Sequence, residues 1–244
     1  KSSNIGAAKL AIQMGEQKFH EYVRRFGFGE ASGVDLPGEI AGRVKPVHKW
    51  SRISITRMPI GHEVAATPLQ VTAAMAAIAN GGLLVRPHVV GSIVDAEGRA
   101  IREFGGEVRR RVIARETAAK VSAALEGVVG DRGTAAQAQV EGFRVAGKTG
   151  TAERVAPEGG YQDGRYVVSF VGYLPAADPA LVALVQVDDP QTDPDNLYGG
   201  TIAAPVFARV ARRALRYLDI EPRFPDFPPA MLSQTSAQPG EARP

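Results

Sequence analysis

The stretch VAGKTGTAE, residues 145–153, constrains the fold more than any other part of this sequence. An apolar lead-in from Phe143 to Ala146 predicts a strand, and the strand continues into a lysine, two threonines and a glycine with no turn signal. A lysine on a central strand is disfavoured unless its charge is paired or reaches a wet cleft. We therefore expect a strand that faces a cleft.

The polar residues of this stretch indicate what the cleft could receive. Thr149 and Thr151 are two residues apart, so their hydroxyls point to the same face of a strand. Gly150 has no side chain and allows another backbone to come close. An ordinary strand with a solvated Lys148 is the alternative interpretation.

Two further apolar runs, residues 166–174 and 181–187, predict strands that form a three-stranded meander with the first. Apolar spacing and capping signals predict helices at residues 4–14, 16–26, 67–80, 115–128 and 202–218. We expect an α+β fold in which an antiparallel sheet carries the last helix on one face and the helical subdomain on the other.

The helix patterns also predict which side chains are buried. The aromatic stripe of residues 16–26 is expected to lie in the core. The last helix is expected to place its arginines in water, opposite its apolar residues: Arg209, Arg212, Arg213 and Arg216 against Phe207, Val210, Ala214 and Leu218. Residues 221–244 are rich in Pro, Ala, Ser and Gln and predict a mobile tail outside the domain of residues 1–220.

Composition argues against several classes of function. The net charge of +3 comes from interspersed charges of both signs, which does not support binding to nucleic acid. The absence of cysteine excludes disulfides and thiolate metal sites. The four histidines show no metal-ligand spacing, and the acidic residues 188–195 lack the glycine and distal glutamate of an EF-hand. We expect no metal and no cofactor.

The ends of the chain also lead to an expectation. No apolar run approaches the roughly 20 residues that span a bilayer. The sequence begins at Lys1 without a methionine, inside a motif-like segment, so we expect a truncated N-terminus and missing targeting information.

Two short motifs point to a family. Ser2-Ser3-Asn4 opens the first predicted helix, and Lys148-Thr149-Gly150 follows the apolar strand. They resemble the S-x-N and K-T-G motifs of the penicillin-recognising serine acyltransferases, whose third motif is S-x-x-K. On its own, Ser2 to Asn4 is more typical of a helix cap.

The amino-acid sequence between the motifs strengthens the resemblance, which covers about residues 1 to 220. It is similar to class B penicillin-binding proteins, the division and elongation type of peptidoglycan D,D-transpeptidase. The matching strings are Phe26-Gly-Phe-Gly29, Asp35-Leu-Pro-Gly-Glu39, Gly61-His-Glu63, Thr67-Pro-Leu-Gln70, Asn80-Gly-Gly82, Gly133-Thr-Ala135 and Tyr198-Gly-Gly200.

One motif of the family is absent. The sequence contains no S-x-x-K, which in the family holds the nucleophilic serine and lies upstream of S-x-N. The nearest string, Thr117-Ala-Ala-Lys120, falls within a predicted surface helix. The resemblance therefore implies the C-terminal part of a transpeptidase domain, inactive alone.

The resemblance assigns roles to the residues that are present. Ser2 and Lys148 would pass a proton to the leaving D-alanine, and Asn4 would hold the substrate amide. The N–H of Thr151 would donate to the oxyanion. Thr149 and Thr151 would bind the terminal carboxylate of a D-Ala-D-Ala stem peptide, which Gly150 allows to lie along the strand edge.

The resemblance also implies partners and a location for the whole protein. It would bind peptidoglycan stem peptides and β-lactams outside the cytoplasmic membrane. Its protein partners would be a membrane-embedded glycan polymerase and a division or elongation complex. Two other interpretations are a serine β-lactamase and a penicillin sensor or inactive scaffold.

Overall fold

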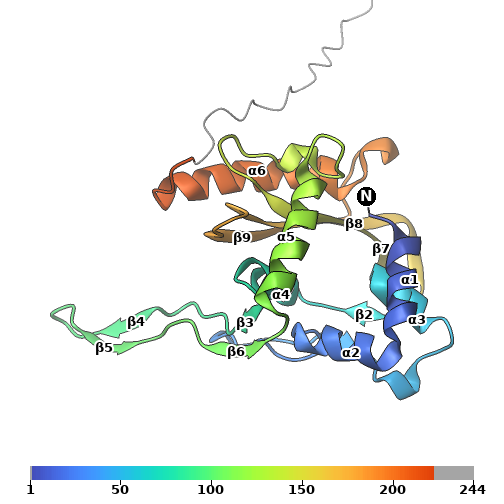
Figure 1. The fold of residues 1–244 in the computed structure, drawn as a ribbon, viewed down its shortest axis with the longest axis horizontal. Coiled ribbons are helices and arrows are strands. Elements are labelled where there is room, and N and C mark those ends of the chain that lie inside the picture. The colour runs from blue at the N-terminus through green and yellow to red at the C-terminus, as the bar shows by residue number, and fades with distance from the viewer. Residues whose placement is uncertain (1, 223–244) are drawn as a thin grey trace, which may run out of the picture.

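The computed structural model describes residues 2–222. Its centre is an antiparallel sheet of β7 (Ala146–Val155), β8 (Tyr161–Leu174) and β9 (Leu181–Asp188), in the order β7-β8-β9. This is the predicted meander, in which β8 begins at Tyr161 rather than at residue 166. Helix α6 (Gly199–Tyr217) covers one face, and α4 (Pro68–Ala79) and α5 (Arg115–Val129) cover the other (Figure 1). The predicted α+β fold is confirmed.

The two faces of β8 explain this layering. Phe170 and Leu174 point toward α6, where the Phe170 ring meets Phe207 edge-on at 4.8 Å between centroids. Val171 and Tyr173 alternate with them and pack toward α4 and α5, against Met75 among others. Because side chains alternate along a strand, an unbroken apolar run buries both faces.

A second group of elements lies beside the sheet. It comprises α1 (Asn4–Met14), α2 (Glu16–Arg25), β1 (Arg43–Val44), η1 (Val47–Lys49), α3 (Ser54–Arg57), η2 (Met58–Ile60) and β2 (Val64–Ala65). Strands β1 and β2 pair, and so do β3 (Leu83–Val85) and β6 (Val108–Arg111). Short 3-10 helices η3 (Ala136–Ala138) and η4 (Pro194–Asn196) complete the fold.

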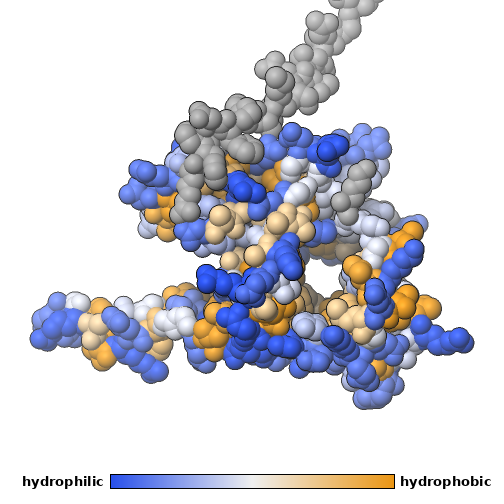
Figure 2. Space-filling model, viewed as in Figure 1, coloured by the Kyte–Doolittle hydropathy of each residue, from blue (hydrophilic) through white to orange (hydrophobic). Residues whose placement is uncertain are grey.

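A hairpin of β4 (Ser92–Val94) and β5 (Ala100–Glu103) projects from the body as an arm (Figure 1). Its turn contains Glu97 and Gly98, and both strands are exposed along their whole length. Figure 2 shows apolar residues at the surface of this arm and of α1. In α1, Ala11 is the only fully buried residue, whereas Ile5 is 71% exposed.

Two expectations about burial were wrong in part. The aromatic stripe of α2 is half-buried, and Phe19 packs edge-on against Trp50 of the irregular segment that follows. Val210 in α6 and Leu218, the residue after its end, are each 49% exposed. The buried line of α6 is Ala204, Phe207, Ala208, Ala211 and Leu215. At 3.6 residues per turn, Val210 therefore falls on the arginine side of the helix.

The expected tail at residues 221–244 lies outside the described residues from residue 223 onward. Within residues 2–222, no helix combines the length and hydropathy needed to cross a bilayer.

Gln70 at the start of α4 organises the irregular segment between α2 and α4. Its side chain is buried, and its Nε2 donates to the carbonyls of Glu30 and Ala41, each at 2.8 Å. Its Oε1 accepts from the N–H of Thr67 at 2.9 Å, and the Thr67 hydroxyl accepts from the N–H of Gln70 at 3.1 Å. One amide thus satisfies backbone groups from three separate segments.

Replacing Gln70 by alanine is expected to lower the free energy of unfolding by about 3 kcal/mol, because it leaves two or more buried carbonyls without donors. Urea denaturation of this chain measures the loss. The control Gln13→Ala changes an exposed glutamine of α1 and is expected to cost less than about 0.5 kcal/mol. Equal midpoints for the two variants would contradict this role for Gln70.

Candidate functional site

A cavity of about 640 Å³ lies where the start of α1, strand β7 and the start of α6 meet. Ser2 and Asn4 contribute from the first element, and Lys148, Thr149 and Thr151 from the second. The remaining lining comes from two loops and the first turn of α6: Gly133, Thr134, Ala136, Gln137, Tyr198, Gly199, Gly200 and Thr201. Five of the six residues predicted for the site thus line one cavity.

Ser3 explains why its neighbours are free to line the cavity. Its Oγ accepts from the N–H of Gly6 at 3.1 Å and caps α1. Ser2 and Asn4 therefore do not serve as the cap, and both are exposed at the cavity. The cap interpretation of this triplet holds for its middle residue only.

Lys148 is half-buried on β7, and its Nζ donates to the carbonyl of Thr149 at 2.7 Å. None of the ion pairs among residues 2–222 includes Lys148. Burial therefore lowers the pKa of the Lys148 ammonium from its ordinary value, because the charged form is desolvated without an anionic partner. A lysine in this state loses a proton more readily than one in water.

Thr134, Thr149 and Thr151 line the same cavity as the lysine. The Oγ1 atoms of Thr149 and Thr134 lie 3.1 Å apart in a hydrogen bond. The Oγ1 of Thr151 accepts from the N–H of Gly199, the first residue of α6, at 3.4 Å. The cavity therefore combines a cation, hydroxyl groups and the positive end of a long helix, a combination that attracts a carboxylate.

Glycines allow α6 to begin directly against the sheet. A Cβ on Gly199 would lie 2.1 Å from the carbonyl oxygen of Ser169 and 2.7 Å from that of Gly150. A Cβ on Gly200 would lie 2.0 Å from the carbonyl oxygen of Thr134. The backbone that approaches Gly150 thus includes that of Gly199 in the same chain. Gly150 itself lies between the lining residues Thr149 and Thr151.

The sequence reasoning did not assign Thr134 or the segment Tyr198 to Thr201 to the site. The available signal was the pair of glycines, Gly199 and Gly200, just before the helix predicted from residue 202, because adjacent glycines allow another backbone to come close. Thr134 offered no such signal, since its loop is brought to β7 only by the packing of α5 and α6.

Glu63 and Asp189 lie outside the cavity lining. Glu63 accepts from the hydroxyl of Ser54 at 2.8 Å and lies within ion-pair distance of Lys45 and Arg57, which indicates a structural role. Asp189 pairs with Arg165 beside β8. No group of three or more His, Asp or Glu side chains in residues 2–222 is arranged to hold a metal ion.

Residues 1–212 match the family described as "Penicillin binding protein transpeptidase domain". Stage V sporulation protein D of Bacillus subtilis is 37% identical over 223 residues, which cover 91% of this chain and 34% of that protein. Peptidoglycan D,D-transpeptidase FtsI of Escherichia coli is 33% identical over 222 residues, covering 91% of this chain and 35% of that protein.

Solved structures of penicillin-binding proteins also resemble this chain. Penicillin binding protein 3 of Mycobacterium tuberculosis in complex with ampicillin superimposes with a TM-score of 0.84 at 34% identity. The match covers 94% of this chain and 52% of that one. This chain spans about a third of the length of each of the two curated relatives named above.

Proposed function

Because this chain belongs to the penicillin-binding protein transpeptidase family, we propose that it forms one wall of the active site of a serine-type peptidoglycan D,D-transpeptidase. The observation that carries the proposal is the single cavity lined by Lys148, Thr149 and Thr151 of β7 together with Ser2 and Asn4. The domain is proposed to comprise residues 1–220, with residues 221–244 as a separate tail.

The proposed reaction exchanges one amide for another through an ester. A serine oxygen bonds to the carbonyl carbon of the D-Ala-D-Ala peptide bond, the C–N bond breaks, and the terminal D-alanine leaves as an amine that takes up a proton. The amine of a second stem peptide then attacks the ester, and the serine regains its proton. We place the serine in an S-x-x-K segment, which these 244 residues do not contain.

Lys148 and Ser2 are proposed to move the proton. Burial lowers the pKa of Lys148, so its ammonium gives up a proton more readily than that of a lysine in water, as a proton-transfer group requires. The Ser2 hydroxyl lines the same cavity and provides a relay toward the leaving amine, and Asn4 holds the substrate amide. The N–H of Thr151 is the proposed oxyanion donor from this chain.

Thr149 and Thr151 are proposed to bind the terminal carboxylate of the stem peptide. Their hydroxyls face the cavity beside Lys148 and the start of α6, so the local charge favours an anion. Within residues 2–222, β7 pairs with β8 alone, which leaves its other edge for an added strand. The stem peptide is proposed to occupy that edge along Gly150.

β-Lactams are proposed to acylate the same serine, and the related structure solved with ampicillin supports this proposal. The whole protein is proposed to act at the outer face of the cytoplasmic membrane, where stem peptides are cross-linked. A membrane-embedded glycan polymerase and a division or elongation complex are its proposed partners.

The experiment that tests the function uses a protein in which this chain is joined to an S-x-x-K segment. Such a protein is expected to take one covalent label from fluorescent penicillin and to release D-alanine when given a stem peptide and an acceptor amine. Labelling without D-alanine release would favour a penicillin sensor. Rapid hydrolysis of the penicillin would favour a β-lactamase.

The 244-residue chain alone is expected to gain no mass after incubation with ampicillin, because it contains no S-x-x-K serine. Mass spectrometry of the intact chain measures the adduct, and the joined protein serves as the positive control. A stoichiometric adduct on the chain alone would place the nucleophile within these residues and overturn its proposed location.

A further inference from the structure

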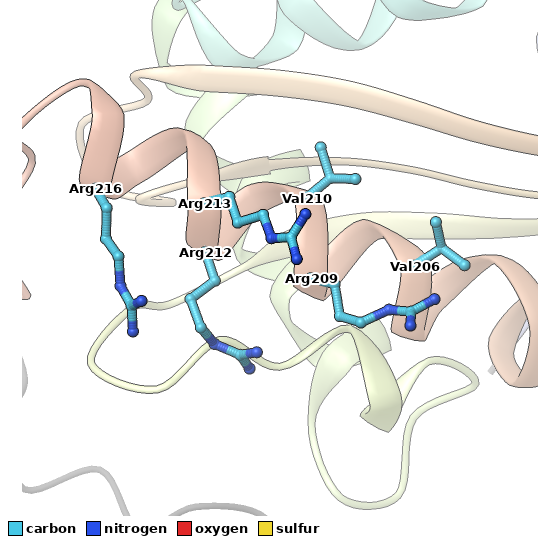
Figure 3. A pocket seen from close by; sticks show the side chains of 6 residues that line it. All are labelled: Val206, Arg209, Val210, Arg212, Arg213 and Arg216. Atoms are coloured by element: carbon cyan, nitrogen blue, oxygen red, sulfur yellow. The ribbon is translucent and has the colours of Figure 1, made fainter.

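Four arginines form one exposed face of α6: Arg209, Arg212, Arg213 and Arg216. Arg212, Arg213 and Arg216 follow Arg209 by three, four and seven residues, which places all four on one side of the helix. Together with Val206 and Val210 they line a hollow of about 470 Å³ (Figure 3). We call these six residues the arginine face.

The arginine face forms no ion pair with the described part of the chain. Among residues 2–222 none of the four guanidinium groups takes part in an ion pair, whereas Arg99, Arg144 and Arg165 each pair with a carboxylate. Helix α6 contains no acidic residue. Four neighbouring cations repel one another, so the face is better suited to an anionic partner than to water alone.

The arginine face is separate from the candidate active site. Gly199 at the start of α6 borders the cavity that contains Lys148. Arg209 is ten residues further along, which corresponds to about 15 Å of helix. A ligand on this face would therefore leave the active site open.

We propose that the arginine face binds an acidic polypeptide segment of a partner protein. Guanidinium groups form paired hydrogen bonds with carboxylates, and arginines one helical turn apart match carboxylates spaced along a helix or strand. The exposed Val210 offers an apolar contact between the charges. This proposal does not depend on the reaction proposed above.

The shape of the face favours a polypeptide over a membrane surface. The distance along the helix from Arg209 to Arg216 is only about 10 Å, and the cations lie on one narrow strip. A bilayer is a wide and flat surface, and it would contact cations spread over several elements. A hollow between guanidinium groups instead fits side chains of a single segment.

The test measures binding of a short fluorescein-labelled peptide, in which glutamates recur every three or four residues, to the 244-residue chain by fluorescence anisotropy. Saturable binding is expected, weakened at least about tenfold in the double variant Arg212→Glu, Arg216→Glu. The control Arg43→Glu, Arg52→Glu changes two exposed arginines elsewhere by the same net charge and is expected to bind as the parent does.

Three results would overturn the proposal. They are equal weakening in both double variants, equal binding of a peptide with glutamine in place of glutamate, and no saturation with the glutamate peptide. Vesicles of phosphatidylcholine and phosphatidylglycerol provide the remaining arm of the experiment. Binding to these vesicles that depends on Arg212 and Arg216, without peptide binding, would assign the face to a membrane instead.

Discussion

Replacing Lys148 by alanine in a protein that joins this chain to an S-x-x-K segment is expected to slow acylation by penicillin about 10²- to 10⁴-fold. Lys148 lines the candidate active site, and burial lowers its pKa. Removing it takes away the group proposed to exchange a proton and the positive charge beside the carboxylate site. Stopped-flow measurement of the acylation rate tests the expectation.

Two variants separate proton transfer from charge. Lys148→Arg retains a cation that does not deprotonate in proteins, so it is expected to restore binding of the carboxylate but not the acylation rate. Lys120→Ala removes an exposed lysine from α5 and is expected to leave the rate unchanged. A wild-type acylation rate in Lys148→Ala would remove Lys148 from the mechanism.

Gly199→Ala is expected to have the largest effect on stability, a loss of about 3 kcal/mol or more in the free energy of unfolding. The new Cβ would lie 2.1 Å from the carbonyl oxygen of Ser169 and 2.7 Å from that of Gly150. Both are backbone atoms of paired strands, so no side-chain rotation relieves the clash. The start of α6 must move away from the sheet, which also separates the Gly199 N–H from Thr151.

The matched control for this substitution is Gly127→Ala. Gly127 is an exposed residue of α5, and a Cβ there would have no neighbour within 4 Å. Alanine is the better helix former, so this variant is expected to gain up to about 1 kcal/mol. Urea denaturation compares the two variants, and a neutral effect of Gly199→Ala would show that the start of α6 can shift without cost.

Local patterns were sufficient for most of the elements. The capping box at Thr67 and Gln70, with a proline at the first helical position, gave the start of α4. The apolar runs predicted β8 and β9 because a strand that packs on both faces is apolar at successive positions, which makes it visible in the sequence. These signals depend on neighbours in sequence, and no distant contact is needed to read them.

Burial was harder to predict because it depends on what lies opposite. The face of α6 that holds Phe207 was expected to include Val210 and Leu218, yet the sheet contacts the line through Ala211 and Leu215 instead. An alanine-rich helix can be rotated about its axis so that different faces, each with a similar number of apolar residues, point toward the core. Packing against the sheet selects one of these faces. The same uncertainty affected α2, whose aromatic residues lie against a loop.

The sequence alone predicted that β7 faces a cleft, because its strand pattern continues into a lysine and two threonines. Only the tertiary structure decided what completes the cleft. Ser2 and Asn4 reach it because Ser3 takes over the cap, and Thr134 and Gly199 reach it because α6 packs on the sheet at two glycines. The physical reason is range: strand and helix patterns repeat over a few residues, whereas a cavity is made by segments more than a hundred residues apart.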